Sequence, residues 1–447
     1  MTASRVLAAY AARARWQDLP QAVRHEAARA LVNWIGLPIW GARDAAVERT
    51  LAALDPFSGP REAALFGRAQ RIDPLKAALV NGVAASIADY DDTHLETVIH
   101  PTGPAACALF ALVERVPMSG AEFLHALALG IEAQCRLAQA LAAPPARMNG
   151  GWYLTGLCGG VGAAVAAGRA LGLDEDRMLW ATGIAAARAA GARETHGSMA
   201  KSLVAAFAGE EGLTAALLAQ RGMEAPEEPI EGRRGLGGLV SEGAHYAAIT
   251  DGLGRRFEVL RNAYKPFPSG IVIHAPLTGA LELAREHRPE PAAIAAVRLA
   301  VHPLCLELCG RRAPRSAAEG TFSVYHWVAV ALAERAIGIR HYSDAVVRDP
   351  RIVALRDRVE AQADPALRKD EARVELVLRD GTTRARHVAH ALGTIERPLS
   401  DAELTAKLTD LVSGVLPPER ADALARTCWG LAEAPDARAL VAAAAVA

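Results

Sequence analysis

Lysine is rare in this chain. Of the 49 basic residues, five are lysine and the rest are arginine. The five are Lys76, Lys201, Lys265, Lys369 and Lys407. In a chain that makes almost all of its positive charge from arginine, a retained lysine indicates a need for a compact ammonium group. Lys201 and Lys265 fall in the two most unusual of the later segments.

Other features are missing as well, and each absence argues against a class of function. The formal net charge is −1, so the composition gives no reason to expect nucleic acid or an anionic membrane as a partner. No apolar run of about 20 residues occurs, so we expect no membrane span. Residues 1–20 show helical periodicity with interspersed arginines, which is unlike a secretory signal. The six cysteines are scattered in apolar surroundings, which predicts buried thiols in a reducing cytoplasm rather than disulfides.

Motifs for bound cofactors are also missing. No HExxH metal-binding motif occurs, and Cys305 and Cys309 have no third cluster ligand near them. The glycines at 159, 160 and 162 do not form a GxGxxG motif after a strand, so we expect them to permit close approach of helices.

The length of the chain, 447 residues, predicts two domains, because it exceeds one ordinary core. Residues 6–114 are rich in alanine and leucine at helical spacing, with breaks at glycine and proline, as in a helical bundle. Residues 264–276, YKPFPSGIVIHAP, contain three prolines and a glycine and are typical of a rigid connector. Beyond it, alternation at 297–301 and two apolar runs around Asp380-Gly381 predict strands and a hairpin with a type I′ turn.

We therefore predict a mainly α protein with a large all-helical domain at residues 1–264 and a smaller α+β lid domain at 265–400. C-terminal helices at 401–447 are expected to pack back on the helical domain. Within the lid, residues 322–336 and 343–362 are predicted to be helical. Ser119 with Glu122, and Ser400 with Glu403, have the spacing of capping boxes, which marks two helix starts.

The stretch from Asn81 to Pro104, NGVAASIADYDDTHLETVIHPTGP, concentrates the chemistry. On a helix, Asp89, Asp92 and Thr93 stand at i, i+3 and i+4 and share one face. His100 precedes a proline, so we expect it in an extended turn beyond that helix, facing the acidic patch. A carboxylate, a hydroxyl and an imidazole held together can hold and move a proton. Two other readings stay open here: a solvated, capped helix end, and a divalent-metal site with Asp and His ligands.

Four segments together resemble the MmgE/PrpD family, which includes 2-methylcitrate dehydratases, cis-aconitate decarboxylases and an iminodisuccinate epimerase. They are NGVAASIADYDDTH with IHPTGP, then GGVGAAVAAGRALG, then GSMAKSL, and finally YKPFPSG with the histidine that follows at 274. The resemblance covers nearly the whole chain. It implies a helical domain with an α+β lid, an active site between them, a homodimer, and no metal or organic cofactor.

The resemblance also implies which residues act. Asp89, Thr93, His100, Lys201 and His274 stand at the family's active-site positions. The chain departs from the family at two places, where Tyr153 and Val204 replace histidines.

On this basis we predict a cofactor-free lyase that acts on a small polycarboxylate, with dehydration of the 2-methylcitrate type as the first choice. His100 is the expected base, Lys201 pairs with a substrate carboxylate, Asp89 orients them, and His274 protonates the leaving hydroxyl or lines the lid. We expect Thr93, Tyr153 and Lys265 to bind substrate. A decarboxylase or an epimerase on the same site is the alternative, and a binding protein that has lost catalysis is a third.

Overall fold

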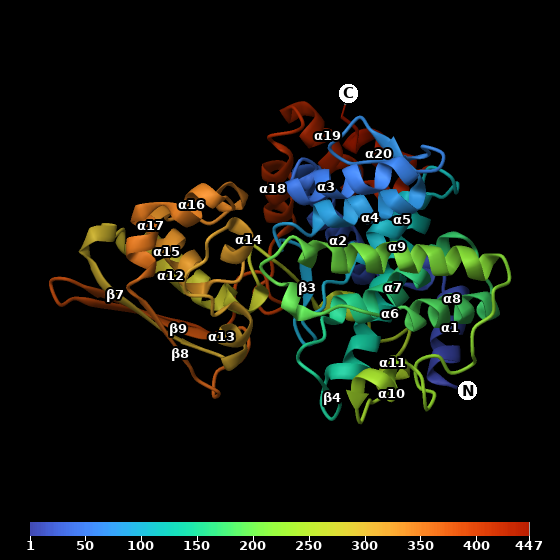
Figure 1. Cartoon of the computed structure of the whole chain (residues 1–447), viewed down its shortest axis with the longest axis horizontal. Coiled ribbons are helices and arrows are strands. Elements are labelled where there is room, and N and C mark those ends of the chain that lie inside the picture. Colours follow the sequence, from blue (N-terminus) through green and yellow to red (C-terminus); the bar gives the residue numbers. More distant parts are fainter. Residues whose placement is uncertain (447) are drawn as a thin grey trace.

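Helices make up most of the structure, which is a computed structural model that describes residues 1–446. Two lobes are visible, a large helical lobe and a smaller lobe that contains the main sheet (Figure 1). The predicted fold class, mainly α with a smaller α+β part, is confirmed. The last residue, Ala447, which belongs to the predicted C-terminal segment, lies outside the described residues.

The helical lobe is formed by the first half of the chain. Its helices are α1 (Ala3–Arg13), α2 (Gln21–Gly41), α3 (Ala45–Leu54), α4 (Pro74–Ala85), α5 (Thr102–Leu112), α6 (Gly120–Ala142), α7 (Leu154–Ala170), α8 (Glu175–Ala187), α9 (Ala200–Gln220), α10 (Leu236–Val240) and α11 (Ala247–Thr250). Three short strand pairs join them: β1 (Ala63–Ala64) with β2 (Arg71–Ile72), β3 (Asp92–His94) with β6 (Asn262–Tyr264), and β4 (Arg147–Met148) with β5 (Ser241–Glu242).

Small residues allow the central helices of this lobe to approach closely. α7 packs against α5, α6, α8 and α9. A β-carbon at Gly162 would lie 2.7 Å from the carbonyl oxygen of Gly130 on α6, and one at Gly159 would lie 2.8 Å from Pro104 on α5. The prediction that these glycines permit helix contact is therefore confirmed for Gly159 and Gly162.

Helix α9 combines length with apolar composition sufficient to cross a membrane, and about half of the relevant stretch, 56%, is buried inside the protein. It packs between α4, α5, α7 and α8, and its first turn carries the buried Lys201. A core helix can be as apolar as a membrane span. Because α9 is packed against four other helices, we interpret it as a core helix.

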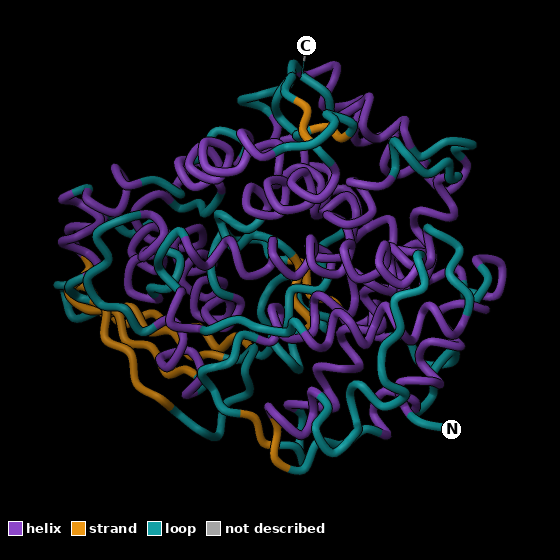
Figure 2. Tube along the Cα trace, turned by 45° about the vertical axis from the view of Figure 1, so that its right-hand side comes forward, coloured by secondary structure: helices purple, strands orange, loops and turns teal. Residues whose placement is uncertain are grey.

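The smaller lobe has its own hydrophobic core, built from residues between Ala263 and Ala391. Its elements are α12 (His274–His287), β7 (Ile294–Val301), α13 (Pro303–Cys309), α14 (Ala317–Gly320), α15 (Val324–Glu334), α16 (Asp344–Arg348), α17 (Pro350–Arg356), β8 (Val359–Ala363), β9 (Ala372–Leu378) and β10 (Thr383–Val388). The strand order is β10-β9-β7-β8, antiparallel except for β7 with β8. Helices α12 and α15 pack on one face of this sheet, which lies at one end of the molecule (Figure 2).

Two predictions for this lobe need correction. Residues 343–362 are not one helix, because α16 and α17 are followed by strand β8, which pairs with β7. The hairpin of β9 and β10 is confirmed, but its turn is not type I′, which requires positive φ at both central residues. Gly381 has φ 85°, whereas Asp380 does not have a positive φ.

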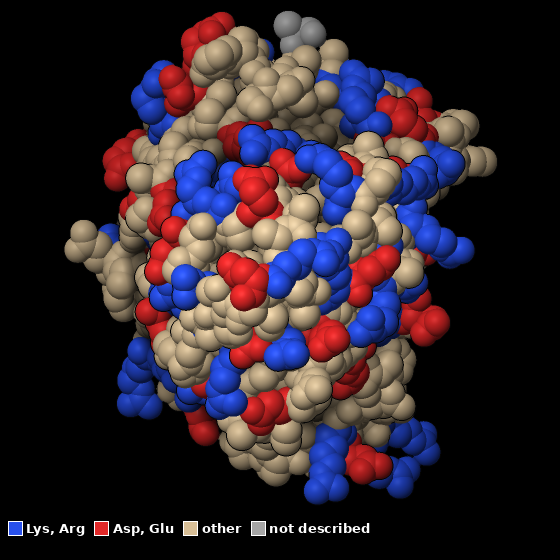
Figure 3. All heavy atoms as spheres, turned by 90° about the vertical axis from the view of Figure 1, so that its left-hand side faces the viewer, with Lys and Arg blue, Asp and Glu red and all other residues tan. Residues whose placement is uncertain are grey.

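The outer face of this sheet carries mixed charge. Arg298 lies on β7 between Glu360 on β8 and Glu375 on β9, and it pairs with Glu375 at 2.9 Å. Viewed from this end, basic and acidic side chains are interspersed, and neither sign dominates the face (Figure 3).

The C-terminal segment returns to the helical lobe. It contains α18 (Asp401–Val412), α19 (Pro418–Trp429) and α20 (Arg438–Ala444), and α18 packs against α2. The capping boxes at Ser119 and Ser400 are both present, so those two helix starts are confirmed. Tyr264, Leu404 and Leu408 share the core of the helical lobe.

Candidate active site

The turn between α4 and β3 brings three carboxylates into the interior. α4 ends at Ala85, Asp89 adopts a left-handed conformation with φ 49°, and β3 begins at Asp92. The predicted helix through Asp89, Asp92 and Thr93 is therefore wrong. β3 pairs antiparallel with β6, so that Asp92 lies opposite Tyr264. This pairing places the acidic turn beside Lys265, which follows β6 directly.

Asp89 is held between two buried ammonium groups. Its Oδ1 pairs with Lys201, and its Oδ2 lies 2.8 Å from Lys265 Nζ, which also donates to the backbone carbonyl of Asp89 at 2.9 Å. Burial alone would raise the pKa of Asp89, but the two lysines outweigh burial and hold it well below its ordinary value. Burial lowers the pKa of Lys201, yet the acids beside it raise it above 10.5. Asp89 and Lys201 are therefore both charged near neutral pH.

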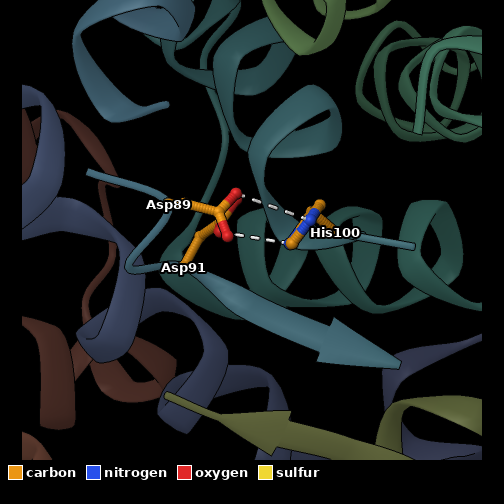
Figure 4. Close-up of side chains that lie close together, drawn as sticks. All are labelled: Asp89, Asp91 and His100. Atoms are coloured by element: carbon orange, nitrogen blue, oxygen red, sulfur yellow. Dashed lines mark ion pairs between the residues drawn. The ribbon is translucent and has the colours of Figure 1, made fainter. Parts of the chain in front are cut away.

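His100 has one ring nitrogen fixed and the other without a close partner. Its Nδ1 lies 2.9 Å from the carbonyl oxygen of Asp92, 3.2 Å from Thr93 Oγ1 and 3.2 Å from Asp91 Oδ1. A carbonyl oxygen only accepts hydrogen bonds, so Nδ1 carries the proton in the neutral ring. Nε2 then holds the lone pair, and it lies 3.8 Å from Asp89 Oδ1, too far for a hydrogen bond (Figure 4).

A small pocket of about 30 Å³ opens beside this group, between the two lobes. It is lined by Asp89, Val98, His100, Tyr153, Arg193, His196, Gly270, Ile271, Val272, Leu308, Cys309 and Phe322. Among the described non-glycine residues, four have a positive φ, and two of these, Asp89 and Val98, line the pocket. A β-branched residue such as Val98 is strained in this conformation, and backbone strain tends to gather at functional sites.

Aromatic rings form one side of the pocket. Tyr153, which directly precedes α7, lies edge-on to His100 at 6.0 Å between ring centres and to His196 at 5.0 Å. His196 in turn stacks on Phe322 of the smaller lobe at 4.7 Å. Burial keeps the pKa of Tyr153 well above 10 and lowers the pKa of His196 to about 4. Both are therefore neutral near pH 7.

The remaining predicted residues lie behind the pocket wall. Thr93, Lys201 and Lys265 are buried against Asp89 or His100 and do not line the pocket. His274 is fully buried at the start of α12, and its Nε2 lies 3.3 Å from the carbonyl oxygen of Ser269. Burial, with a contribution from Lys265, lowers the pKa of His274 to about 3. Its predicted role as the acid for a leaving hydroxyl stays a prediction.

Lys407 on α18 supports the site from the far side, and sequence reasoning assigned it no role. Its Nζ donates to the backbone carbonyls of Tyr90 at 2.7 Å and of Lys265 at 2.8 Å, and to Asn33 Oδ1 at 2.8 Å. It thereby joins the segment that carries Asp89 to the segment that carries Lys265. Its only signal in the sequence is the scarcity of lysine.

Asp89, Asp91 and His100 offer ligand atoms within 4.8 Å of one another, so their arrangement is compatible with a metal ion. Both oxygens of Asp89, however, are already paired with ammonium groups. A divalent cation there would have to displace a lysine and tolerate the positive charge of the other. The site therefore suits proton transfer better than metal binding.

The comparison with protein families identifies the class of the protein. The model of the MmgE/PrpD N-terminal domain matches residues 5–248, and that of the MmgE/PrpD C-terminal domain matches residues 267–431. The chain belongs to the MmgE/PrpD family, and the resemblance drawn from the four motifs is confirmed.

Curated relatives are named as lyases. The chain is 25% identical over 445 residues to a cis-aconitate decarboxylase of Aspergillus terreus, which covers 93% of this chain and 90% of that protein. It is 26% identical over 387 residues to the cis-aconitate decarboxylase of Homo sapiens, and this match covers 82% of this chain and 78% of that protein. A shorter match, 36% over 95 residues, covers 21% of this chain and 19% of a 2-methylcitrate dehydratase of Cupriavidus necator.

Proposed function

We propose that the protein is a lyase that acts on a small polycarboxylate by proton transfer at His100. The observation that carries this proposal is the fixed tautomer of the ring, with Nδ1 held by the Asp92 carbonyl and Nε2 available at the pocket. The chain itself supplies the groups that such a reaction needs, so the proposed reaction requires neither a metal nor an organic cofactor.

The surroundings of His100 suit both directions of proton transfer. When Nε2 takes a proton from a carbon beside a carboxylate, the imidazolium is stabilised by Asp91 at Nδ1 and by Asp89. Burial raises the pKa of Asp91, but His100 and Lys265 outweigh burial and lower it to about 2, so its carboxylate is charged. Lys201 and Lys265 offset the charge of these acids and of the enolate-like intermediate.

Decarboxylation is the reaction we propose first. Relatives named cis-aconitate decarboxylase match most of the chain, whereas the match to the dehydratase covers 21% of it. Loss of carbon dioxide leaves a carbanion, which takes a proton from the imidazolium form of His100 at Nε2 or from a second acid at the pocket, and the donor regains its proton from solvent. Tyr153, where family members have a histidine, is a neutral phenol at the pocket and a suitable donor. Dehydration, the first choice from the sequence, stays a prediction and is the second candidate.

Product analysis distinguishes these reactions. The purified protein is incubated with cis-aconitate or with 2-methylcitrate in the presence of EDTA, and carbon dioxide and organic products are measured. We expect carbon dioxide from cis-aconitate and turnover that EDTA does not reduce. Loss of water from 2-methylcitrate without carbon dioxide would favour the dehydratase. Activity that depends on an added metal would contradict the proposed chemistry.

We also propose that the protein is a homodimer in the cytoplasm. The family resemblance supports the dimer, and the six cysteines, which are all buried and free, suit a reducing compartment. Light scattering at micromolar concentration tests the first claim, and a monomer there would contradict it.

A further inference from the structure

Arg193 is the only lysine or arginine among the residues that line the pocket. Lys201, which sequence reasoning assigned to a substrate carboxylate, lies behind Asp89 and pairs with it. Lys265 pairs with the same carboxylate. Together these two ammonium groups balance the charges of Asp89 and Asp91, so neither is available to a ligand without breaking a buried ion pair.

The side chain of Arg193 lines the pocket, and its Nε has no acceptor among the residues that the structure describes. The residue begins a short 3-10 helix, Arg193–Thr195, and its backbone N–H donates to the carbonyl oxygen of Gly151 at 2.9 Å. Its Nε is buried and has no hydrogen-bond partner among residues 1–446. Burial lowers its pKa from 12.5, and the attraction of Tyr153 and Glu307 does not offset this. A buried donor without a partner is costly unless a ligand satisfies it.

We propose that Arg193 binds one carboxylate of the substrate, so that the reacting carbon lies at His100. This inference rests on the proposed function, and it names the group that selects for a carboxylate. A guanidinium suits this role because its planar donors match the two oxygens of a carboxylate. The wall of the pocket that the smaller lobe supplies is mainly apolar, with Ile271, Val272, Leu308 and Phe322, and it would contact the carbon skeleton between the two polar ends.

The test compares ligand and protein truncations in one binding experiment. Calorimetry measures the dissociation constants of cis-aconitate and of three analogues that each lack a different one of its three carboxylates: citraconate, cis-glutaconate and itaconate. The proteins are the wild type, Arg193→Gln, Arg193→Lys, and Arg188→Gln as a matched control. Arg188 directly follows α8, a few residues before Arg193 in the chain. It pairs with Glu211 at 3.2 Å, and its side chain is 55% exposed.

We expect Arg193→Gln to weaken cis-aconitate binding by about ten- to a hundredfold, as for a lost hydrogen-bonded ion pair. Arg193→Lys should lose less, and Arg188→Gln should bind as the wild type. The analogue that lacks the carboxylate held by Arg193 should bind the wild type and Arg193→Gln equally. Because all three analogues are measured, the one that is insensitive also identifies the carboxylate.

Three results would overturn the inference. Binding of cis-aconitate by Arg193→Gln within threefold of the wild type would show that another group holds the carboxylate. Equal losses for all four ligands would show a collapsed pocket instead of one missing contact. A wild type that binds none of the ligands would overturn this inference together with the proposed function, whereas binding without turnover would contradict the lyase alone.

Discussion

Replacing Asp89 with asparagine removes the charge that holds two buried lysines. Lys201 is 5% exposed and Lys265 is fully buried, and both ammonium groups contact this one carboxylate. Breaking a buried ion pair by removing one partner costs about 3–5 kcal/mol, because the other charge stays buried and uncompensated. We expect Asp89→Asn to lower the free energy of unfolding by about 4 kcal/mol at pH 7.

The matched variants separate charge from packing. Lys201→Met leaves Asp89 paired with Lys265, so it should cost less than Asp89→Asn. The double variant Asp89→Asn with Lys201→Met should be more stable than Asp89→Asn alone, because one uncompensated ammonium is removed. Urea denaturation followed by tryptophan fluorescence measures all four proteins. Six of the seven tryptophans precede or follow the smaller lobe, so the signal reports mainly the helical lobe that holds Asp89.

The pH dependence of this effect has a defined sign. The pKa of Asp89 is lower in the folded protein than its ordinary value of 3.8. Its contribution to stability is therefore present above pH 3.8 and is lost as the pH falls through the lower folded value. The difference between wild type and Asp89→Asn should shrink below pH 4. Equal stability of the two proteins at pH 7, or strictly additive effects in the double variant, would refute the ion-pair reasoning.

Four further substitutions test the packing and the polar interior. Gly160→Ala should stabilise α7 by about 0.5–1 kcal/mol, because its β-carbon would meet nothing nearer than 3.7 Å, whereas Gly162→Ala should cost about 1–3 kcal/mol through its contact with α6. Equal thermal midpoints for this pair would contradict the close helix contact. Burial and Asp91 raise the pKa of Asp92 from 3.8 to about 6. The protonated carboxyl of Asp92 therefore adds about 3 kcal/mol to the free energy of unfolding below pH 3.8, and this contribution is lost as the pH rises from 3.8 through 6. Urea titrations should show this loss in the wild type and not in Asp92→Asn. Lys407→Met leaves three buried oxygens without a donor and should cost about 3 kcal/mol and lower the turnover rate, and an unchanged rate would show that Lys407 does not position the site.

Local signals in the sequence predicted the parts of the fold that depend on neighbouring residues. Ser119 with Glu122 and Ser400 with Glu403 mark two helix starts correctly, because a capping box involves residues three apart. The hairpin at Asp380-Gly381 is local in the same way. The predicted turn type was wrong, because a type I′ turn needs a positive φ at both Asp380 and Gly381 and only Gly381 has one.

The site depended on contacts between distant segments, and these carry no periodic signal. The spacing of residues 89–94 predicts a helix, but the left-handed conformation of Asp89 ends the helical pattern. Strand β3 instead pairs with β6, and the side chains of Asp92 and Asn262, which form a hydrogen bond, are 170 residues apart along the chain. The sharing of Asp89 by Lys201 and Lys265, and the support from Lys407, follow from this pairing. His100 was identified because its chemistry and the proline after it are visible in the sequence itself.

The most direct test of the central claim is the turnover of cis-aconitate by His100→Asn. Asparagine keeps an N–H that can donate to the Asp92 carbonyl in place of Nδ1, and it removes Nε2. If His100 transfers the proton, the turnover rate should fall by about 10²–10⁴-fold, while the thermal midpoint and the dissociation constant of cis-aconitate change little. A rate within tenfold of the wild type would contradict proton transfer at His100.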